Sequence, residues 1–205
     1  KIDAETVLYV PQDDRPVSLQ YTVDTAREAG MTILTPPQNL ISGKNYQGQA
    51  DQIMAWVEQN AGRADVMVLS TDTLIYGGLV DSRKHNIPLT TLESRLKRIE
   101  SLKARNKNVR IYGFGTVMRS PRASGGGTEP AYYAEYGPTI FQIAALQDKL
   151  DSGSLTQEET QKLMSLQASV PVEYLQDWFD RRQKNMKINK ELIDETRSGV
   201  FDYFA

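Results

Sequence analysis

Two adjacent carboxylates follow the first apolar stretch of this sequence. Residues 6–10 are apolar and lead into the turn Pro11–Pro16, which holds Asp13, Asp14 and Arg15 between two prolines. A tight turn can bring both carboxylates to one pocket, and two close acids beside an arginine suit acid–base catalysis or a hard cation. The alternative is a turn that caps the following helix, with Arg15 as the ion-pair partner of an aspartate.

A third carboxylate, Asp72, comes directly after residues 66–70, the most apolar of the predicted strands. The carboxyl ends of parallel strands meet at one edge of a sheet, so we expect Asp72 to lie on the same side as Asp13 and Asp14. We predict that these three aspartates are catalytic, and that they are the ligands of a divalent cation if the protein uses one as a cofactor. The alternative for Asp72 is an aspartate that caps a helix.

Glycines and arginines after the same strands suggest how a substrate would be held. Gly77 and Gly78 allow a positive φ or a close approach of the backbone to a ligand. Arginines near the sheet edge suit recognition of a carboxylate or phosphate, although each of them could instead neutralise a nearby aspartate. The arginines in question are Arg15, Arg83, Arg119 and Arg122. The residues that we predict to bind substrate are Arg15, Tyr76, Gly77, Gly78, Arg83 and Arg119.

The remaining residues with chemical potential are one histidine and a group of tyrosines. His85 follows two cations in a polar stretch, so we predict a surface residue rather than a catalytic one. The tyrosines Tyr132, Tyr133 and Tyr136 lie beside the triple glycine 125–127. They could form a mobile lid over a sugar or a ring, or they could pack against the edge of the sheet.

The composition excludes several kinds of site and partner. The 205 residues include no cysteine and one histidine, which rules out disulfides, zinc–thiolate sites, thiol nucleophiles and multi-histidine metal centres. A formal net charge of -2 gives no basic excess for nucleic acid. Neither a Walker-type phosphate loop nor a GxGxxG sequence is present. No apolar run reaches the ~20 residues that span a bilayer, so we predict no transmembrane segment. As the partner we predict a small-molecule or carbohydrate ligand.

Strand and helix patterns alternate over the first part of the chain, which indicates an α/β fold. This order predicts parallel strands with right-handed crossovers, and it places every loop that follows a strand at one edge of the sheet. The sheet is either an open three-layer sheet or an incomplete (β/α) barrel, and we favour the open form because a full barrel takes about 250 residues. The predicted strands are residues 6–10, 31–35, 66–70 and 109–114.

Two sequences of the form S/T-x-x-E predict helix N-termini with reciprocal side-chain capping. They are Thr90–Glu93 and Thr156–Glu159, and each precedes a series of apolar residues at helical spacing. The last residues, 200–205, are apolar and look like the first half of a further strand.

We predict a single α/β domain over residues 1–205. It comprises a β/α core at 1–118, a Gly/Tyr-rich loop at 119–136 and a mainly helical part at 137–205. The first residue is lysine, which a cleaved secretion signal or a fragment boundary would explain. Signal cleavage would place the protein outside the cell or in its envelope, and a fragment boundary leaves a cytoplasmic location open.

Two segments, Val10–Val17 and Ser70–Arg83, resemble the DUF4127 family of uncharacterised bacterial proteins. That family shows a PLDDRPxN-like turn and, after its third strand, a D-x-L-x-YGGLxxSR segment; here Gln12 replaces the usual leucine. Arg119, ahead of the segment Glu129–Tyr133, is also similar to the family. The resemblance covers essentially the whole chain and implies that the two motifs share one site. It brings no established activity.

Members of that family are longer, so the resemblance implies that this chain is an amino-terminal portion with part of its site beyond residue 205. From the residues themselves we predict a hydrolase that acts on a carbohydrate-like or anionic substrate through carboxylates at the C-terminal edge of the sheet. The alternative is a non-catalytic α/β domain that binds a small ligand. In a third interpretation, Asp–Arg pairs only hold the loops of the sheet edge together.

Overall fold

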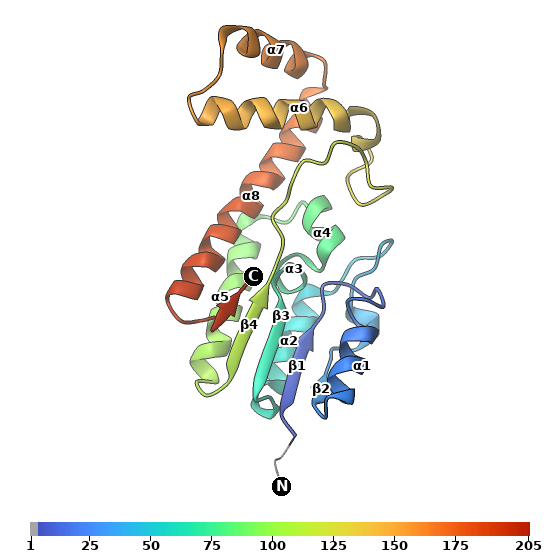
Figure 1. The fold of residues 1–205 in the computed structure, drawn as a ribbon, viewed down its shortest axis with the longest axis vertical. Coiled ribbons are helices and arrows are strands. Elements are labelled where there is room, and N and C mark those ends of the chain that lie inside the picture. Colours follow the sequence, from blue (N-terminus) through green and yellow to red (C-terminus); the bar gives the residue numbers. More distant parts are fainter. Residues whose placement is uncertain (1–3) are drawn as a thin grey trace.

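The structure, a computed structural model that describes residues 4–205, is built on an open sheet of five parallel strands (Figure 1). The spatial order is β2-β1-β3-β4-β5, so β2 and β5 are free edges and the sheet does not close into a barrel. This confirms the α/β class and the open form of the sheet. The strands are β1 Thr6–Val10, β2 Thr32–Leu34, β3 Val66–Ser70, β4 Arg110–Phe114 and β5 Tyr203–Phe204.

Eight α-helices and two 3₁₀ turns connect these strands in the described part of the chain. Two short helices follow β3, where α3 begins without an intervening loop and α4 precedes the 17-residue α5. The last third is mainly helical, as expected. The helices are α1 Gln20–Glu28, α2 Ala50–Asn60, α3 Thr71–Tyr76, α4 Leu79–Lys84, α5 Leu89–Arg105, α6 Tyr133–Asp151, α7 Gln157–Ala168 and α8 Val172–Arg197, and the 3₁₀ turns are η1 Gln38–Leu40 and η2 Ala61–Arg63.

The main core lies between one face of the sheet and the helices α2, α5 and α8. Successive side chains of a strand point to opposite faces, so alternate residues of β1, β3 and β4 enter this core. The fully buried members from the strands are Leu8, Val10, Met67, Leu69 and Ile111, and helix α5 supplies Leu92, Leu96, Ile99 and Leu102. At about 25 cal/mol for each Å² of apolar surface buried, this layer is the principal stabilising contribution to the fold.

The opposite face of the sheet is covered less completely. Helix α1 lies over β1 and β2, where Val23 is buried. An apolar groove of about 310 Å³ runs beside α1 and is lined by Tyr9, Ile33, Val68 and other residues of this face. The layers are therefore unequal, with α1 on one side and α2, α5 and α8 on the other.

The helices α6 and α7 and the first half of α8 form an arm that extends beyond the carboxyl edge of the sheet (Figure 1). The arm has its own apolar clusters, which include Tyr133, Ile140 and Trp178. Farther along α8, Ile188 and Leu192 belong to the main core. One 26-residue helix therefore joins the arm to the sheet.

The two predicted capping boxes have different outcomes. The box at Thr156 and Glu159 is confirmed, with both reciprocal hydrogen bonds at the start of α7. The box at Thr90 was wrong, because α5 already begins at Leu89 after Pro88. Glu93 instead forms an ion pair with Lys187 of α8 at 2.8 Å. The predicted strand at the end of the chain is confirmed as β5, which pairs in parallel with β4.

Candidate functional site

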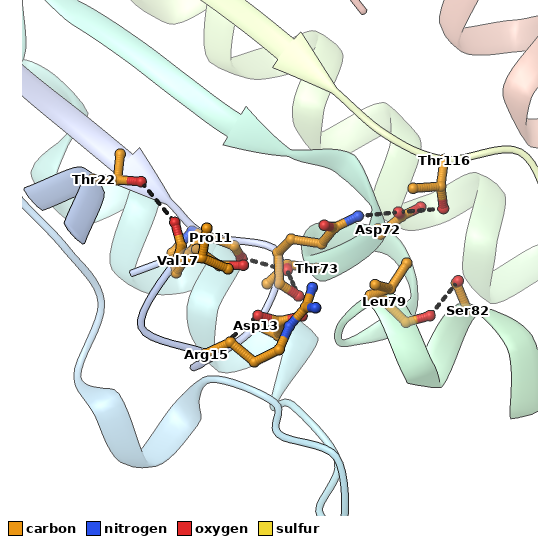
Figure 2. Close-up of polar contacts among 12 residues, drawn as sticks. Pro11, Asp13, Arg15, Val17, Thr22, Asp72, Thr73, Leu79, Ser82 and Thr116 are labelled. Carbon is orange, nitrogen blue, oxygen red and sulfur yellow. Dashed lines mark hydrogen bonds and ion pairs between the residues drawn. The ribbon is translucent and has the colours of Figure 1, made fainter. Parts of the chain in front are cut away.

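The carboxyl ends of β1, β3 and β4 are tied together by hydrogen bonds across the sheet edge (Figure 2). Thr73 Oγ1 donates to the carbonyl oxygen of Pro11 at 2.7 Å, and Thr71 Oγ1 donates to that of Phe114 at 3.2 Å. The strand order changes direction at β1, which has β2 on one side and β3 on the other. Open α/β sheets bind ligands at this switch point, outside the carboxyl ends of the strands.

Asp72 lies at this switch point because α3 starts immediately after β3. Ser70 caps α3 by accepting a hydrogen bond from the Thr73 amide at 3.2 Å, and Asp72 falls in the first turn. Its side chain is 2% exposed. The Thr116 hydroxyl, from the end of β4, donates to Asp72 Oδ2 at 2.7 Å, and the Gln12 amide, from the β1 turn, donates at 3.4 Å (Figure 2). Three strand ends therefore surround one carboxyl group.

Burial raises the pKa of Asp72 to about 6. The hydrogen bonds from Thr116 and Gln12 and the positive charge of Arg83 favour the ionised form, but they offset only part of the effect of burial. A carboxyl group with a pKa near 6 is populated in both protonation states close to neutral pH. Asp72 is therefore suited to exchange a proton with a bound molecule.

Asp13 has a different environment from Asp72. It is 6% exposed and forms an ion pair with Arg15, whose Nη2 lies 2.8 Å from Asp13 Oδ2. Arg15 Nε donates to the same oxygen at 2.9 Å, and the Arg15 amide donates to Oδ1 at 3.2 Å. The pair closes the turn after β1. The sequence had left this ion pair open as the alternative to a catalytic role for the two residues.

Asp14 lies apart from Asp13 and Asp72. The Asp14 amide donates to Ser42 at 2.9 Å, and its half-buried side chain lines a separate groove with Arg27 and Thr35. Within residues 4–205, no three Asp, Glu or His side chains gather so that they could hold a metal ion. A divalent cation held by Asp13, Asp14 and Asp72 stays a prediction, although the first carboxylate is held by its arginine and the second faces another groove.

The glycine pair serves the packing of the chain itself. Gly77 has φ +107° and ends α3 in the left-handed conformation that glycine adopts without strain. A Cβ at Gly77 would lie 2.8 Å from the carbonyl oxygen of Gly48, and one at Gly78 would lie 2.6 Å from the Cβ of Ser42. Residues 42–48 therefore pack closely against these two glycines, in the place that the sequence suggested for a ligand.

The four arginines have separate surroundings. Arg83 is half-buried, and its charge lowers the pKa of Asp72, which links it to the switch point. Arg122 places its guanidinium 5.3 Å from the centre of the Phe141 ring. Arg119 is exposed and makes no hydrogen bond or ion pair with the rest of residues 4–205. Arg83 is thus the member of the predicted group whose charge acts on Asp72.

Tyr76 and His85 form a buried aromatic pair, with ring centres 4.8 Å apart. The prediction of a surface histidine was wrong, because His85 is 7% exposed and lies against α8. The Ile87 amide donates to His85 Nδ1 at 3.2 Å, so the proton is on Nε2, which lies 2.7 Å from Asn185 Oδ1. Burial lowers the pKa of His85 to about 4, so the ring is neutral at physiological pH.

The tyrosines after the triple glycine belong to the helical arm. Tyr133 is fully buried against Trp178, with ring centres 4.4 Å apart. Tyr132 stacks on Tyr174 at 4.6 Å and donates its hydroxyl hydrogen bond to Asp177 at 2.6 Å. Both interpretations of these tyrosines, a mobile lid and a cover for the sheet edge, are replaced by a structural role in the arm.

Two site residues were missed by the sequence reasoning. Gln12 and Thr116 are the hydrogen-bond donors to Asp72, and neither was predicted to be part of the site. Thr116 comes two residues after β4, so the argument from strand ends that selected Asp72 could also have selected it. The sequence did not single out Gln12, because a glutamine in a charged turn is not distinctive of a functional site.

This fold and site define an open-sheet α/β protein with a buried carboxyl group at the switch point. The family described as "Protein of unknown function (DUF4127)" matches residues 7–205, nearly the whole chain, so the chain belongs to that family. This confirms the resemblance seen in the two motifs. A search of curated proteins and of solved structures found no significant match. No helix in the described residues has the length and apolar character needed to cross a membrane.

Proposed function

We propose that this protein is a hydrolase in which Asp72 transfers protons to and from a carbohydrate-like or anionic substrate. The observation that supports the proposal is the position of Asp72, a buried carboxyl group with a pKa of about 6 at the switch point of the sheet. Catalytic acids and bases need pKa values near the pH at which they work. Asp13 differs from Asp72 in that it forms an ion pair with Arg15 at 2.8 Å.

The neighbours of Asp72 have complementary roles in this proposal. Thr116 holds one carboxyl oxygen through a short hydrogen bond of 2.7 Å and fixes the orientation of the group. Gln12 is half-buried and makes a long hydrogen bond of 3.4 Å, so a substrate or water can replace its amide at low cost. Arg83 supplies positive charge near the carboxyl group.

A single acid–base residue fits this geometry better than a pair of carboxylates. Glycosidases of the retaining and inverting types use two carboxyl groups on either side of the scissile bond. Here Asp13 is occupied by Arg15, and Asp14 lines a different groove. In the step that we propose, ionised Asp72 accepts a proton from water as the water oxygen attacks the substrate, and the leaving group then receives that proton.

The test is hydrolysis of chromogenic glycosides and carboxylic and phosphate esters by the wild-type chain and by Asp72→Asn. The variant keeps the size and the hydrogen-bond acceptor but cannot take up a proton, so we expect a loss of roughly 10²–10⁴-fold in kcat/KM. Asp24→Asn, at an exposed position on α1, is the matched control and keeps full activity. Activity that survives in Asp72→Asn would contradict the proposal.

A second candidate function, binding of a small ligand without catalysis, is supported by the burial of the Asp72 side chain. Because that side chain is only 2% exposed, a ligand would have to displace Gln12 before it reached the carboxyl group. A domain that binds a small molecule without changing it does not need such access. Saturable binding by the wild-type chain without turnover of any substrate class would favour this second function.

A further inference from the structure

A second cavity lies between the first turns of α2 and α5 and the end of α4, with Tyr76 of α3 in its wall. Its volume is about 590 Å³, within the range of sites for small organic ligands. Gln52, Asp81, Lys84 and Arg95 contribute polar groups to its walls, and Tyr76 and His85 contribute rings. None of these residues contacts the Asp72 carboxyl group through a hydrogen bond.

The charges around this cavity are balanced. The Arg95 guanidinium binds both carboxylate oxygens of Asp51, with Nε at 3.1 Å and Nη2 at 3.2 Å. Asp81 accepts a hydrogen bond from the Gly48 amide at 3.0 Å, and Lys84 is near enough for its charge to act on Asp81. With two acids matched by two bases, the cavity offers no net charge to attract a free ion.

Some polar groups around this cavity have no hydrogen-bond partner among residues 4–205. The Tyr76 side chain is 6% exposed, and its hydroxyl group has no hydrogen-bond partner in the described structure. Leaving a buried polar group unpaired costs roughly 1–3 kcal/mol, so a ligand that bonds to this hydroxyl recovers that energy. In addition, neither α2 nor α5 has a side chain that caps its N-terminus.

We propose that this cavity binds an uncharged sugar or polyol. Each hydroxyl group of such a ligand both donates and accepts hydrogen bonds, which matches walls made of amides, paired carboxylates, paired cations and a free phenol. Tyr76 follows Asp72 by one turn of α3, so the cavity wall and the proposed acid–base group are on the same helix. The inference rests on the proposed function for the role of the ligand as substrate, but the binding itself does not require catalysis.

The test is a titration of the full chain with glucose, galactose, N-acetylglucosamine and myo-inositol, followed by ¹H–¹⁵N NMR. We expect saturable shifts of the amides of Gln52, His85 and Ile87. Tyr76→Phe removes one hydroxyl group and breaks no existing hydrogen bond, so the fold is retained while binding weakens roughly tenfold. Tyr21→Phe, at a 62% exposed position on α1, is the matched control and leaves binding unchanged.

A second variant keeps the test independent of Tyr76. Gln52→Ala, at an exposed position of α2, also weakens binding without disturbing the core. The inference is overturned if none of the four compounds gives saturable shifts at these amides, if inorganic phosphate binds there in their place, or if binding is insensitive to both variants. Binding that persists in Asp72→Asn supports the cavity assignment even where no hydrolysis is detected, and in that case only the proposed reaction fails.

Discussion

Asp72 and Asp13 are both buried aspartates at strand ends, yet their partners differ in charge. Asp13 receives a guanidinium group, whereas Asp72 receives a hydroxyl and an amide. Neutral donors recover less of the free energy that a carboxylate loses on leaving water. The proton therefore binds Asp72 more tightly in the folded protein than in the unfolded chain, and this difference has a measurable effect on stability.

The effect of Asp72 on stability has a definite sign. Because folding raises its pKa from 3.8 to about 6, the contribution of this proton to stability is complete below pH 4 and is lost as the pH rises through 6. Asp72→Asn lacks this dependence. The unfolding free energy of Asp72→Asn relative to wild type should increase by up to about 3 kcal/mol between pH 4 and pH 7, as measured by urea denaturation. A relative stability that is the same at both pH values would contradict the assignment.

At the scale of elements, the junction of α3 and α4 depends on tight packing against the loop before α2. A Cβ at Gly78 would overlap Ser42, whose own Cβ would be 2.6 Å away. We therefore expect Gly78→Ala to reduce the unfolding free energy by roughly 1–3 kcal/mol, and Ser42→Gly in the same chain to restore part of the loss. Gly62→Ala, where a Cβ meets nothing within 4 Å, is the control and should not destabilise the fold. If Gly78→Ala and Gly62→Ala changed the denaturation midpoint equally, the packing of Gly78 on Ser42 would not be important for stability.

The packing of α8 on α5 buries another acid, Glu195, which is 5% exposed. Burial and the neighbouring carboxyl group of Glu100 raise its pKa to about 9, so it is protonated in the folded state at neutral pH. The stabilisation that comes from the proton on Glu195 is complete below pH 4.5 and is lost as the pH rises toward 9. Glu195→Gln should therefore stabilise the protein by up to roughly 3 kcal/mol at pH 7 and have little effect at pH 4, by chemical denaturation. Glu158→Gln, exposed on α7, should have little effect at either pH.

At the scale of the whole molecule, Arg181 connects the helical arm to the sheet layer. It is 3% exposed and donates to the carbonyl oxygen of His85 at 2.6 Å and to Asn86 at 3.0 Å. On its own helix it forms an ion pair with Asp177 at 2.9 Å. These contacts hold α8 against the segment that joins α4 to α5, next to the hydrogen bond that Asn185 donates to Ser82.

Arg181→Met should loosen this connection and destabilise the protein by roughly 1–3 kcal/mol, because it leaves the His85 carbonyl without its donor and Asp177 with only the Tyr132 hydroxyl. Hydrogen exchange should accelerate most in α6, α7 and the first half of α8. Arg197→Met, at an exposed position in the last turn of α8, should have almost no effect. Exchange that increases equally in the arm and in β3 would mean that the arm and the sheet open as one unit.

The parts of the fold that could be predicted are those set by local sequence. Uninterrupted apolar runs mark β1 and β3, and an acid placed directly after the most apolar run put Asp72 at the right edge. The spacing of Asp13 and Arg15 was compatible with a catalytic pair and with a closed turn, and only the geometry separates these two. The burial of His85 depends on Asn185, one hundred residues away, which no local pattern reports.

The proton affinity of Asp72 underlies both its proposed role and its effect on stability, and it is measured directly by a ¹³C NMR titration of the Asp72 carboxyl group in the full chain. The assignment of the signal follows from its absence in Asp72→Asn. We predict a midpoint near pH 6. A midpoint at or below pH 4, the range of an ordinary or ion-paired aspartate, would contradict it.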